Sequence, residues 1–245
     1  MVSKEFSPYT PQELKVFKSS SMAMLGGQNS TILENAEVKQ RVSVKRLVPV
    51  AGLDIEKALW SQGYYYVGGV DEAGRGPLAG PVVVAGVILD PNKVECLEVD
   101  DSKKLSKSLR EALYEKIISE SIDHQIQILE STEIDRLNIL NATLKGMRQA
   151  VEALQPIPDY VLIDGNRLPK LPLPAQAVVK GDQKSKSIAA ASILAKVTRD
   201  RIMKEYDRDY PEWEFSKHKG YPTKRHKELL NKFDPTPIHR KTFRW

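Results

Sequence analysis

Acidic side chains at the ends of apolar segments are the residues of this chain best suited to catalysis. An acid or a pair of acids ends, or closely follows, each of three strand-like segments: Asp71 with Glu72, then Asp164, then Asp182. Strands of a sheet lie about 4.8 Å apart, so acids at the ends of neighbouring strands can converge on one spot. Clustered carboxylates repel each other unless a proton or a cation neutralises them. Because oxygen ligands favour Mg²⁺ or Mn²⁺ over zinc, the pattern predicts a divalent-cation site.

Each acid also has a simpler structural interpretation when it is taken alone. Asp182 precedes a segment expected to be helical and could cap that helix, and Asp164 stands in an Asp-Gly turn. The pair Asp71 and Glu72 is harder to explain in this way, because two adjacent buried charges without a partner are strongly destabilising. We expect either Arg75 or a metal ion to neutralise them.

A glycine-rich segment, residues 73–80, follows the acid pair. It lacks the Gly-Lys-Ser/Thr of a Walker loop, and a strand rather than a helix follows it, which excludes a dinucleotide-binding fingerprint. Its glycines would let backbone N–H groups approach a ligand beside the acids, although an ordinary hairpin turn is the alternative. Adjacent strand residues point to opposite faces. Asp71 and Glu72 can therefore serve one site only if the chain twists or leaves the strand at Ala73 and Gly74.

Hydrophobic periodicity predicts regular structure from about Leu53 onward. Strands are expected at 64–70, 81–89, 125–129, 160–164 and 175–179, and helices at 54–62, 105–121, 139–154, 186–206 and 223–232. The connection between the first two strands is too short for a parallel crossover, so these strands should form a hairpin. The fold class predicted is α/β, with a mixed sheet and helices on its faces.

Length and composition limit the class of protein. The 245 residues suffice for one large domain or two small ones with a hydrophobic core. No apolar run approaches the roughly 20 residues of a membrane span, and the N-terminus has no apolar leader core. The single cysteine, Cys96, allows no internal disulfide, which favours a cytoplasmic location. Residues 1–50 show no sustained period, and we expect them to form a mobile or partly ordered extension.

The charge distribution favours a polyanionic partner. The net charge is +5 and the calculated pI is about 9.1. The last thirty residues carry only two acids, Glu228 and Asp234. Their basic residues are Lys217, His218, Lys219, Lys224, Arg225, His226, Lys227, Lys232, His239, Arg240, Lys241 and Arg244. They form either a footprint for phosphates or a solvated basic tail.

Several motifs resemble those of the ribonuclease HII family. The segment 69–82, GVDEAGRGPLAGPV, is similar to the opening signature of that family. Further segments agree in the same order: 101–105, 137–143, 162–166, 180–182, 187–200 and 220–223. The resemblance is specific and runs from about Leu53 to the C-terminus, which leaves residues 1–50 outside it.

The resemblance implies a ribonuclease H-like fold, in which a mixed five-stranded sheet is flanked by helices and a C-terminal helical portion closes over the substrate. Residues 51–245 would form this catalytic domain. The residues implied to bind the metal ions and carry catalysis are Asp71, Glu72, Asp164 and Asp182. Those implied to bind nucleic acid are Gly74, Arg75, Gly76, Lys103 and Tyr221. The related type HIII enzymes carry a separate N-terminal domain and usually a glutamate at the fourth acidic position, which here is Asp182.

The activity implied is endonucleolytic hydrolysis of the RNA strand of RNA–DNA hybrids. It includes cutting 5′ of ribonucleotides embedded in duplex DNA, and it leaves 3′-hydroxyl and 5′-phosphate ends. Two Mg²⁺ or Mn²⁺ ions are expected in the complex of a monomeric enzyme with its substrate. Two alternatives remain open: another nuclease of the ribonuclease H fold, such as a junction resolvase, and a non-catalytic nucleic-acid-binding module.

Overall fold

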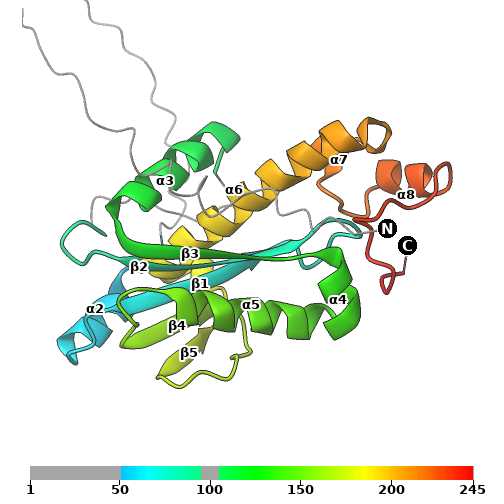
Figure 1. The fold of residues 1–245 in the computed structure, drawn as a ribbon. Coiled ribbons are helices and arrows are strands. Elements are labelled where there is room, and N and C mark those ends of the chain that lie inside the picture. The colour runs from blue at the N-terminus through cyan, green and yellow to red at the C-terminus, as the bar shows by residue number, and fades with distance from the viewer. Residues whose placement is uncertain (1–50, 95–104, 245) are drawn as a thin grey trace, which may run out of the picture. The chain divides into compact units, whose positions relative to one another are not determined.

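A five-stranded mixed sheet forms the centre of the protein (Figure 1). The computed structural model describes residues 51–94 and 105–244, so the predictions for residues 1–50, Cys96 and Lys103 lie outside the described residues. The strand order is β3-β2-β1-β4-β5. The bounds are β1 Val67–Ala73, β2 Val82–Leu89, β3 Ser121–Leu129, β4 Tyr160–Asp164 and β5 Ala175–Val178. The predicted mixed five-stranded sheet is confirmed.

The register of the sheet brings two of the predicted acids to the same edge. β1 and β2 form the expected antiparallel hairpin, whereas β1 and β4 run parallel with Val70 opposite Ile163. The next residue on each strand is an acid, Asp71 on β1 and Asp164 on β4. Asp164 also ends the parallel ladder with β5, opposite Val178. Two neighbouring parallel strands thus deliver a carboxylate at the same level.

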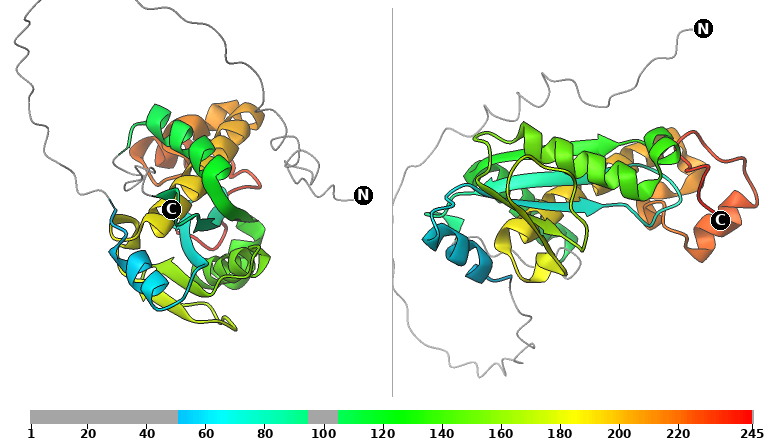
Figure 2. Two further views of the ribbon diagram at one scale, coloured as in Figure 1. Left: turned by 90° about the vertical axis from the view of Figure 1, so that its left-hand side faces the viewer. Right: turned by 90° about the horizontal axis from the view of Figure 1, so that it is seen from below.

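Helices cover both faces of the sheet (Figures 1 and 2). One face packs against α6 (Lys186–Asp209), whose Ala189, Ala190 and Ala191 are completely buried. The other face packs against α5 (Ile139–Ala153), which contributes Met147 and Ala150 to a second core cluster. The helices in chain order are α2 Asp54–Ser61, α3 Lys107–Glu120, α4 Ser131–Leu137, α5 Ile139–Ala153, α6 Lys186–Asp209, α7 Phe215–His218 and α8 Lys224–Leu230.

The C-terminal helices pack at the end of the sheet where the β1–β2 turn lies (Figure 1). Trp213 and Phe215 are fully buried there and their rings stack, with centroids 5.9 Å apart. An isolated antiparallel bridge joins Ala79 of the turn to His239 near the C-terminus. The predicted C-terminal helical portion therefore exists, and it is attached directly to the glycine-rich turn.

Several predicted boundaries were wrong for identifiable reasons. β1 begins at Val67 rather than residue 64 and continues through the acids, because its ladder with β2 extends to Ala73 opposite Val83. α6 runs three residues beyond its predicted end, to Asp209. The seven-residue helix α4 was not predicted, since so short a segment shows little periodicity. Within the described ranges, no helix has both the length and the apolar character needed to cross a membrane.

Candidate active site

Asp71 occupies a buried position at the end of β1. Its side chain is only 5% exposed, and its Oδ1 accepts a hydrogen bond of 2.7 Å from the backbone N–H of Glu72. Burial raises the pKa of Asp71 well above its ordinary value, and the carboxylates of Glu72 and Asp164 raise it further. A hydrogen bond with the Ser192 side chain of α6 opposes this shift. The acids thus concentrate negative charge that a bound cation would relieve.

Asp164 connects the end of β4 to the turn that carries Asp182. Its Oδ1 accepts a hydrogen bond of 2.7 Å from the backbone N–H of Gly181. Gly181 begins a short 3-10 helix, Gly181–Gln183, in which Asp182 is 4% exposed. The cap of α6 is Ser185, whose hydroxyl accepts from the N–H of Ile188. The alternative interpretation of Asp182 as a helix cap is therefore wrong.

Glu72 points to the opposite face of the sheet from Asp71. The Asp71 side chain hydrogen-bonds to Ser192 of α6. Side chains alternate along a strand, so Val70 and Glu72 share the other face. Val70 packs there in the core cluster that includes residues of α5. The Glu72 carboxylate pairs with the Arg75 guanidinium at 3.2 Å. The expectation that Arg75 helps to neutralise the acid pair is confirmed for Glu72. β1 continues through Ala73, so the carboxylates of Asp71 and Glu72 leave the strand on opposite faces. They can reach a common site only beyond the end of the strand.

Carboxylate oxygens are the kind of ligand that a hard divalent cation such as Mg²⁺ prefers. In residues 51–94 and 105–244, no three His, Cys, Asp or Glu side chains are arranged to hold a metal ion together. Mg²⁺ is usually bound by one or two carboxylates, several waters and substrate phosphates rather than by an all-protein cage. Asp71 and Asp164 lie within electrostatic reach of each other, which fits such a site.

The glycine-rich turn beside the acids is held by a buried arginine of α6. Arg199 is 1% exposed, and it donates to the carbonyl oxygens of Pro81 at 2.9 Å and Ala79 at 3.1 Å. A third bond, of 3.0 Å, reaches the carbonyl of Lys219. Gly74 has φ +96°, and a Cβ there would lie 2.0 Å from Arg199 Nε. Glycine is thus required at position 74 by backbone conformation and by the close approach of Arg199.

A second buried arginine, Arg240, holds the same turn from the C-terminal segment. It is 0% exposed and donates to the carbonyl oxygens of Gly74 at 2.5 Å, Arg75 at 3.0 Å and Gly80 at 2.8 Å. The sequence places Arg240 in the basic C-terminal segment, interpreted as a phosphate footprint or a solvated tail, and assigns no role to Arg199. The Arg-Asp pair at 199–200 lies in a recognised motif, but its sequence gives no sign that this arginine is buried.

Arg75 lies beside the acidic edge, and Tyr221 lies beside the glycine-rich turn that carries Arg75. Arg75 and Asp164 line the same small cleft of about 50 Å³, together with the exposed residues Asn166 and Arg167. Arg167 is a cation beside the acids that sequence reasoning missed. Tyr221 is 41% exposed, and its ring lies 3.8 Å from the position that a Cβ on residue 76, a glycine, would take. The structure therefore brings together the turn at Gly74–Gly76 and Tyr221, which are far apart in the sequence.

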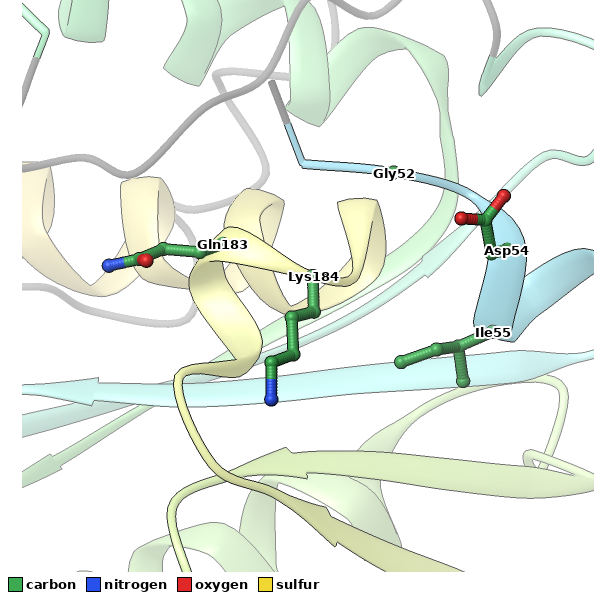
Figure 3. A pocket seen from close by; sticks show the side chains of 5 residues that line it. All are labelled: Gly52, Asp54, Ile55, Gln183 and Lys184. Atoms are coloured by element: carbon green, nitrogen blue, oxygen red, sulfur yellow. The ribbon is translucent and has the colours of Figure 1, made fainter. Parts of the chain in front are cut away.

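A larger hollow of about 420 Å³ lies near the turn that carries Asp182 (Figure 3). Its lining residues are Gly52, Asp54, Ile55, Gln183 and Lys184. In Figure 3 the side chains of Lys184 and Ile55 extend on one side of the hollow, and the Asp54 carboxylate points away from the Lys184 amine. None of the four predicted catalytic carboxylates lines this hollow.

The basic C-terminal segment is only partly a surface feature. His218, His226, His239 and Arg240 are buried and cannot contact a duplex directly. Arg225 is exposed but pairs with Glu214 and, at 3.7 Å, with Glu228. The exposed basic residues are Lys217, Lys224, Arg225, Lys227, Lys232, Lys241 and Arg244. Both interpretations of the segment, a phosphate footprint or a solvated tail, therefore apply only to its exposed residues, because the buried residues hold the turn and the C-terminal helices together.

Comparison with known sequences identifies the family. The family model for ribonuclease HII matches residues 68–245. A ribonuclease HII from Clostridioides difficile is 54% identical over 185 residues, which cover 75% of this chain and 72% of the relative. A ribonuclease HII from Caldicellulosiruptor saccharolyticus is 50% identical over 190 residues, which cover 78% of this chain and 92% of the relative.

Solved structures agree with this result. Ribonuclease H2 from Pyrococcus horikoshii is 32% identical, with a TM-score of 0.65 over 72% of this chain and 93% of that one. Ribonuclease HII from Archaeoglobus fulgidus, solved as a complex with PCNA, is 27% identical, with a TM-score of 0.64 over 74% of this chain and 96% of that one. The sheet, its flanking helices and the acids at its edge define a nuclease with the ribonuclease H fold. The chain belongs to the ribonuclease HII family, and it is a hydrolase with ribonuclease H activity.

Proposed function

We propose that this enzyme cuts the RNA strand of RNA–DNA hybrids and cuts 5′ of ribonucleotides embedded in duplex DNA. The products are a 3′-hydroxyl and a 5′-phosphate. The observation that carries the proposal is the convergence of Asp71 and Asp164 at one sheet edge, with Arg75 beside them and Tyr221 beside the neighbouring Gly76. The carboxylates suit hydrolysis of a phosphodiester, and the flanking residues suit recognition of a ribose and its neighbour.

The four carboxylates Asp71, Glu72, Asp164 and Asp182 are proposed as the metal-binding and catalytic residues. Two bound Mg²⁺ or Mn²⁺ ions would activate water and stabilise the leaving 3′ oxygen. Asp71 and Asp164 supply oxygen ligands from adjacent strands, and the Gly181 N–H fixes the Asp164 carboxylate through Oδ1. Arg75 limits the negative charge by pairing with Glu72.

Selectivity for ribose is proposed to come from the turn at Gly74, Arg75 and Gly76. The 2′-hydroxyl of RNA both donates and accepts hydrogen bonds, which distinguishes it from DNA. The half-exposed Arg75 guanidinium can contact a phosphate, a role that we also propose for Lys103. The ring of Tyr221, beside Gly76, is suited to pack on the deoxyribose that follows the ribonucleotide. Such a contact would recognise the junction from RNA into DNA.

One substrate separates this proposal from its alternatives: a DNA duplex with a single embedded ribonucleotide. The enzyme should cut it on the 5′ side of the ribonucleotide in Mg²⁺ or Mn²⁺, and EDTA should stop the reaction. A junction resolvase would leave this duplex intact and cut a four-way junction instead. A non-catalytic module would bind the duplex without turnover in either metal. Either result contradicts the proposal.

A further inference from the structure

Three buried histidines meet beneath the backbone that carries Tyr221. They are His218 at the end of α7, His226 in α8 and His239 in the C-terminal segment, with exposed fractions of 8%, 0% and 1%. The rings of His218 and His226 stack with centroids 4.3 Å apart. The Nε2 atoms of His226 and His239 lie 3.1 Å apart. The proposed chemistry uses none of the three.

The neighbours of His218 and His239 fix the protonation of both rings. Backbone N–H groups can only donate hydrogen bonds. Gly220 N lies 3.1 Å from His218 Nδ1, and Thr236 N lies 2.9 Å from His239 Nδ1, so both Nδ1 atoms are unprotonated acceptors. The proton of each neutral ring is therefore on Nε2. His218 Nε2 donates it to the carbonyl of Trp213 at 2.7 Å, and His239 Nε2 directs it at His226.

The tautomer of His226 follows from that of His239. Its Nε2 must accept the proton directed from His239, so its own proton is on Nδ1. That atom lies 3.0 Å from the carbonyl oxygen of Tyr221, which is an acceptor. One assignment of protons thus satisfies these contacts. The chain of bonds runs from Thr236, whose hydroxyl also lies 2.9 Å from His239 Nδ1, through His239 and His226 to Tyr221.

These bonds act on a backbone that is confined from the other side as well. The carbonyl of Gly220 accepts from the N–H of Leu78 at 2.8 Å, and a Cβ at Gly220 would lie 2.4 Å from the carbonyl oxygen of Ala79. Residues 220 and 221 are therefore held between the glycine-rich turn and the histidines. The Tyr221 ring itself is 41% exposed. Its backbone is therefore one anchor of its position, in addition to the neighbours of the ring, Gly76 and Arg199.

The hydrogen-bond network of His218, His226 and His239, here called the relay, requires that all three rings stay neutral. Burial lowers the pKa of both His226 and His239 to about 4, and it also lowers the pKa of His218. A proton on His226 Nε2 would face the Nε2–H of His239 and break the chain of bonds. The rings are thus neutral near pH 7, as the hydrogen-bond pattern requires.

We propose that His239 and His226 are positioning residues that hold Tyr221 at the RNA–DNA junction through a fixed chain of neutral tautomers, and that His218 supports them by stacking on His226 and accepting from the N–H of Gly220. This inference rests on the proposed function of Tyr221. It adds that three buried side chains on separate segments hold the exposed Tyr221 ring in the position that this function needs.

The tautomers can be tested without any activity measurement. Long-range ¹H–¹⁵N correlation spectra of the full-length protein at pH 7 distinguish Nδ1–H, Nε2–H and doubly protonated rings. We expect Nε2–H for His218 and His239 and Nδ1–H for His226. An Nε2–H tautomer or a charged ring at His226 would overturn the relay.

The role of the relay is tested by a double-mutant cycle with Tyr221→Ala. The quantity measured is kcat/KM on a single embedded ribonucleotide divided by kcat/KM on a long hybrid. His226→Leu should lower this ratio about tenfold, because coupling of that size is usual for residues in contact. In the Tyr221→Ala background, His226→Leu should lower the ratio no further. His226→Asn can still donate through Nδ2 to the Tyr221 carbonyl, so it should retain most of the ratio.

The matched control is Leu229→Ala on the same helix. Leu229 is 2% exposed in the adjoining core cluster, so its loss should lower the melting temperature but leave the ratio unchanged. Equal ratios for Leu229→Ala and His226→Leu, or independent losses in the cycle, would overturn the relay as a positioning device. If Tyr221→Ala itself leaves the ratio unchanged, the proposed function of Tyr221 fails, and the positioning role fails with it. In that case the spectra would still report whether the hydrogen-bonded chain exists.

Discussion

The Oδ1 atom of Asp164 accepts a hydrogen bond of 2.7 Å from the backbone N–H of Gly181. This bond joins the end of β4 to the short helix that carries Asp182, although 17 residues separate the two partners. It orients one carboxylate and fixes the start of the segment that holds another. The separation of the acids in the proposed site therefore depends on residue 181.

Gly181→Ala should reduce cleavage because there is no room for a side chain. A Cβ at position 181 would lie 2.5 Å from Ile188 Cδ1 and 3.2 Å from Asp164 Oδ1. We expect a loss of kcat of about tenfold or more, as misplacement by about 1 Å can cost a hundredfold. Ile188→Val removes Cδ1 and should restore part of the activity of the double variant. No recovery in steady-state assays would show that the contact with Asp164 dominates.

Asp71→Asn should stabilise the metal-free enzyme while nearly abolishing cleavage. Burial and the neighbouring acids raise the pKa of Asp71, so its ionised form is unfavourable at pH 7. Removing the charge should therefore raise the free energy of unfolding measured in EDTA. Asp90→Asn, in a surface turn with Lys93, is the control and should give no such gain. A lower melting temperature for Asp71→Asn would contradict the argument.

Acid should destabilise the fold through the buried histidines. Their unfolded pKa is about 6.5, whereas the folded pKa of His226 and His239 is about 4. The unfolded state therefore binds more protons between these values, and stability falls as pH drops from about 6.5 to 4. Each ring contributes a slope of up to about 1.4 kcal/mol per pH unit. The raised pKa of Asp71 acts in the opposite sense.

Urea titrations between pH 7 and pH 4.5 measure this slope. His226→Asn removes one titrating ring. It should reduce the pH dependence of the free energy of unfolding by the equivalent of up to about one bound proton. Carboxyl groups with lowered pKa values, such as Asp207, lose their contribution mainly below this window. A slope unchanged by His226→Asn would show that the ring is protonated alike in both states.

Lys224 and Lys227 should supply counterion release when the enzyme binds a duplex. Both are exposed on α8, whereas Arg225 between them is partly neutralised by Glu214 and Glu228. Neutralising both lysines should reduce the slope of log K against log salt by about 2, since each phosphate contact adds about 0.9. Arg225→Gln should have a smaller effect, and Lys57→Gln on α2 serves as the distant control. Equal slopes for all variants would place α8 away from the substrate.

Residues 51–245 should suffice for folding and cleavage. The family match begins at residue 68, and removal of residues 1–50 should change the melting temperature little. A deletion that continues through α2 should be destabilising. It removes the fully buried Glu56, whose Oε1 accepts from Ser185 at 2.6 Å and from the N–H of Ser187 at 3.0 Å. Equal melting temperatures for the two deletions would contradict this boundary.

The sequence alone predicted the elements that deliver the acids. Apolar segments ending in Asp71 and Asp164 predicted adjacent strand ends, because strand propensity and the position of an acid are local properties. The glycine-rich turn and the hairpin were predicted for the same reason. The motifs in their order also indicated the family, which the comparisons confirm.

Tertiary structure alone decided which polar residues are buried. Sequence placed His226 and Arg240 in one basic surface, but both are completely buried. Arg240 bonds to the Gly74 carbonyl 166 residues away, and Arg199 bonds to the Ala79 carbonyl 120 residues away. The hydrophobic periodicity of the sequence does not indicate such contacts, because a buried guanidinium is stable only where carbonyl oxygens from distant residues converge on its donors. Arg240, one of the charges that suggest a phosphate footprint or a solvated tail in the sequence, thus holds the glycine-rich turn in place in the fold.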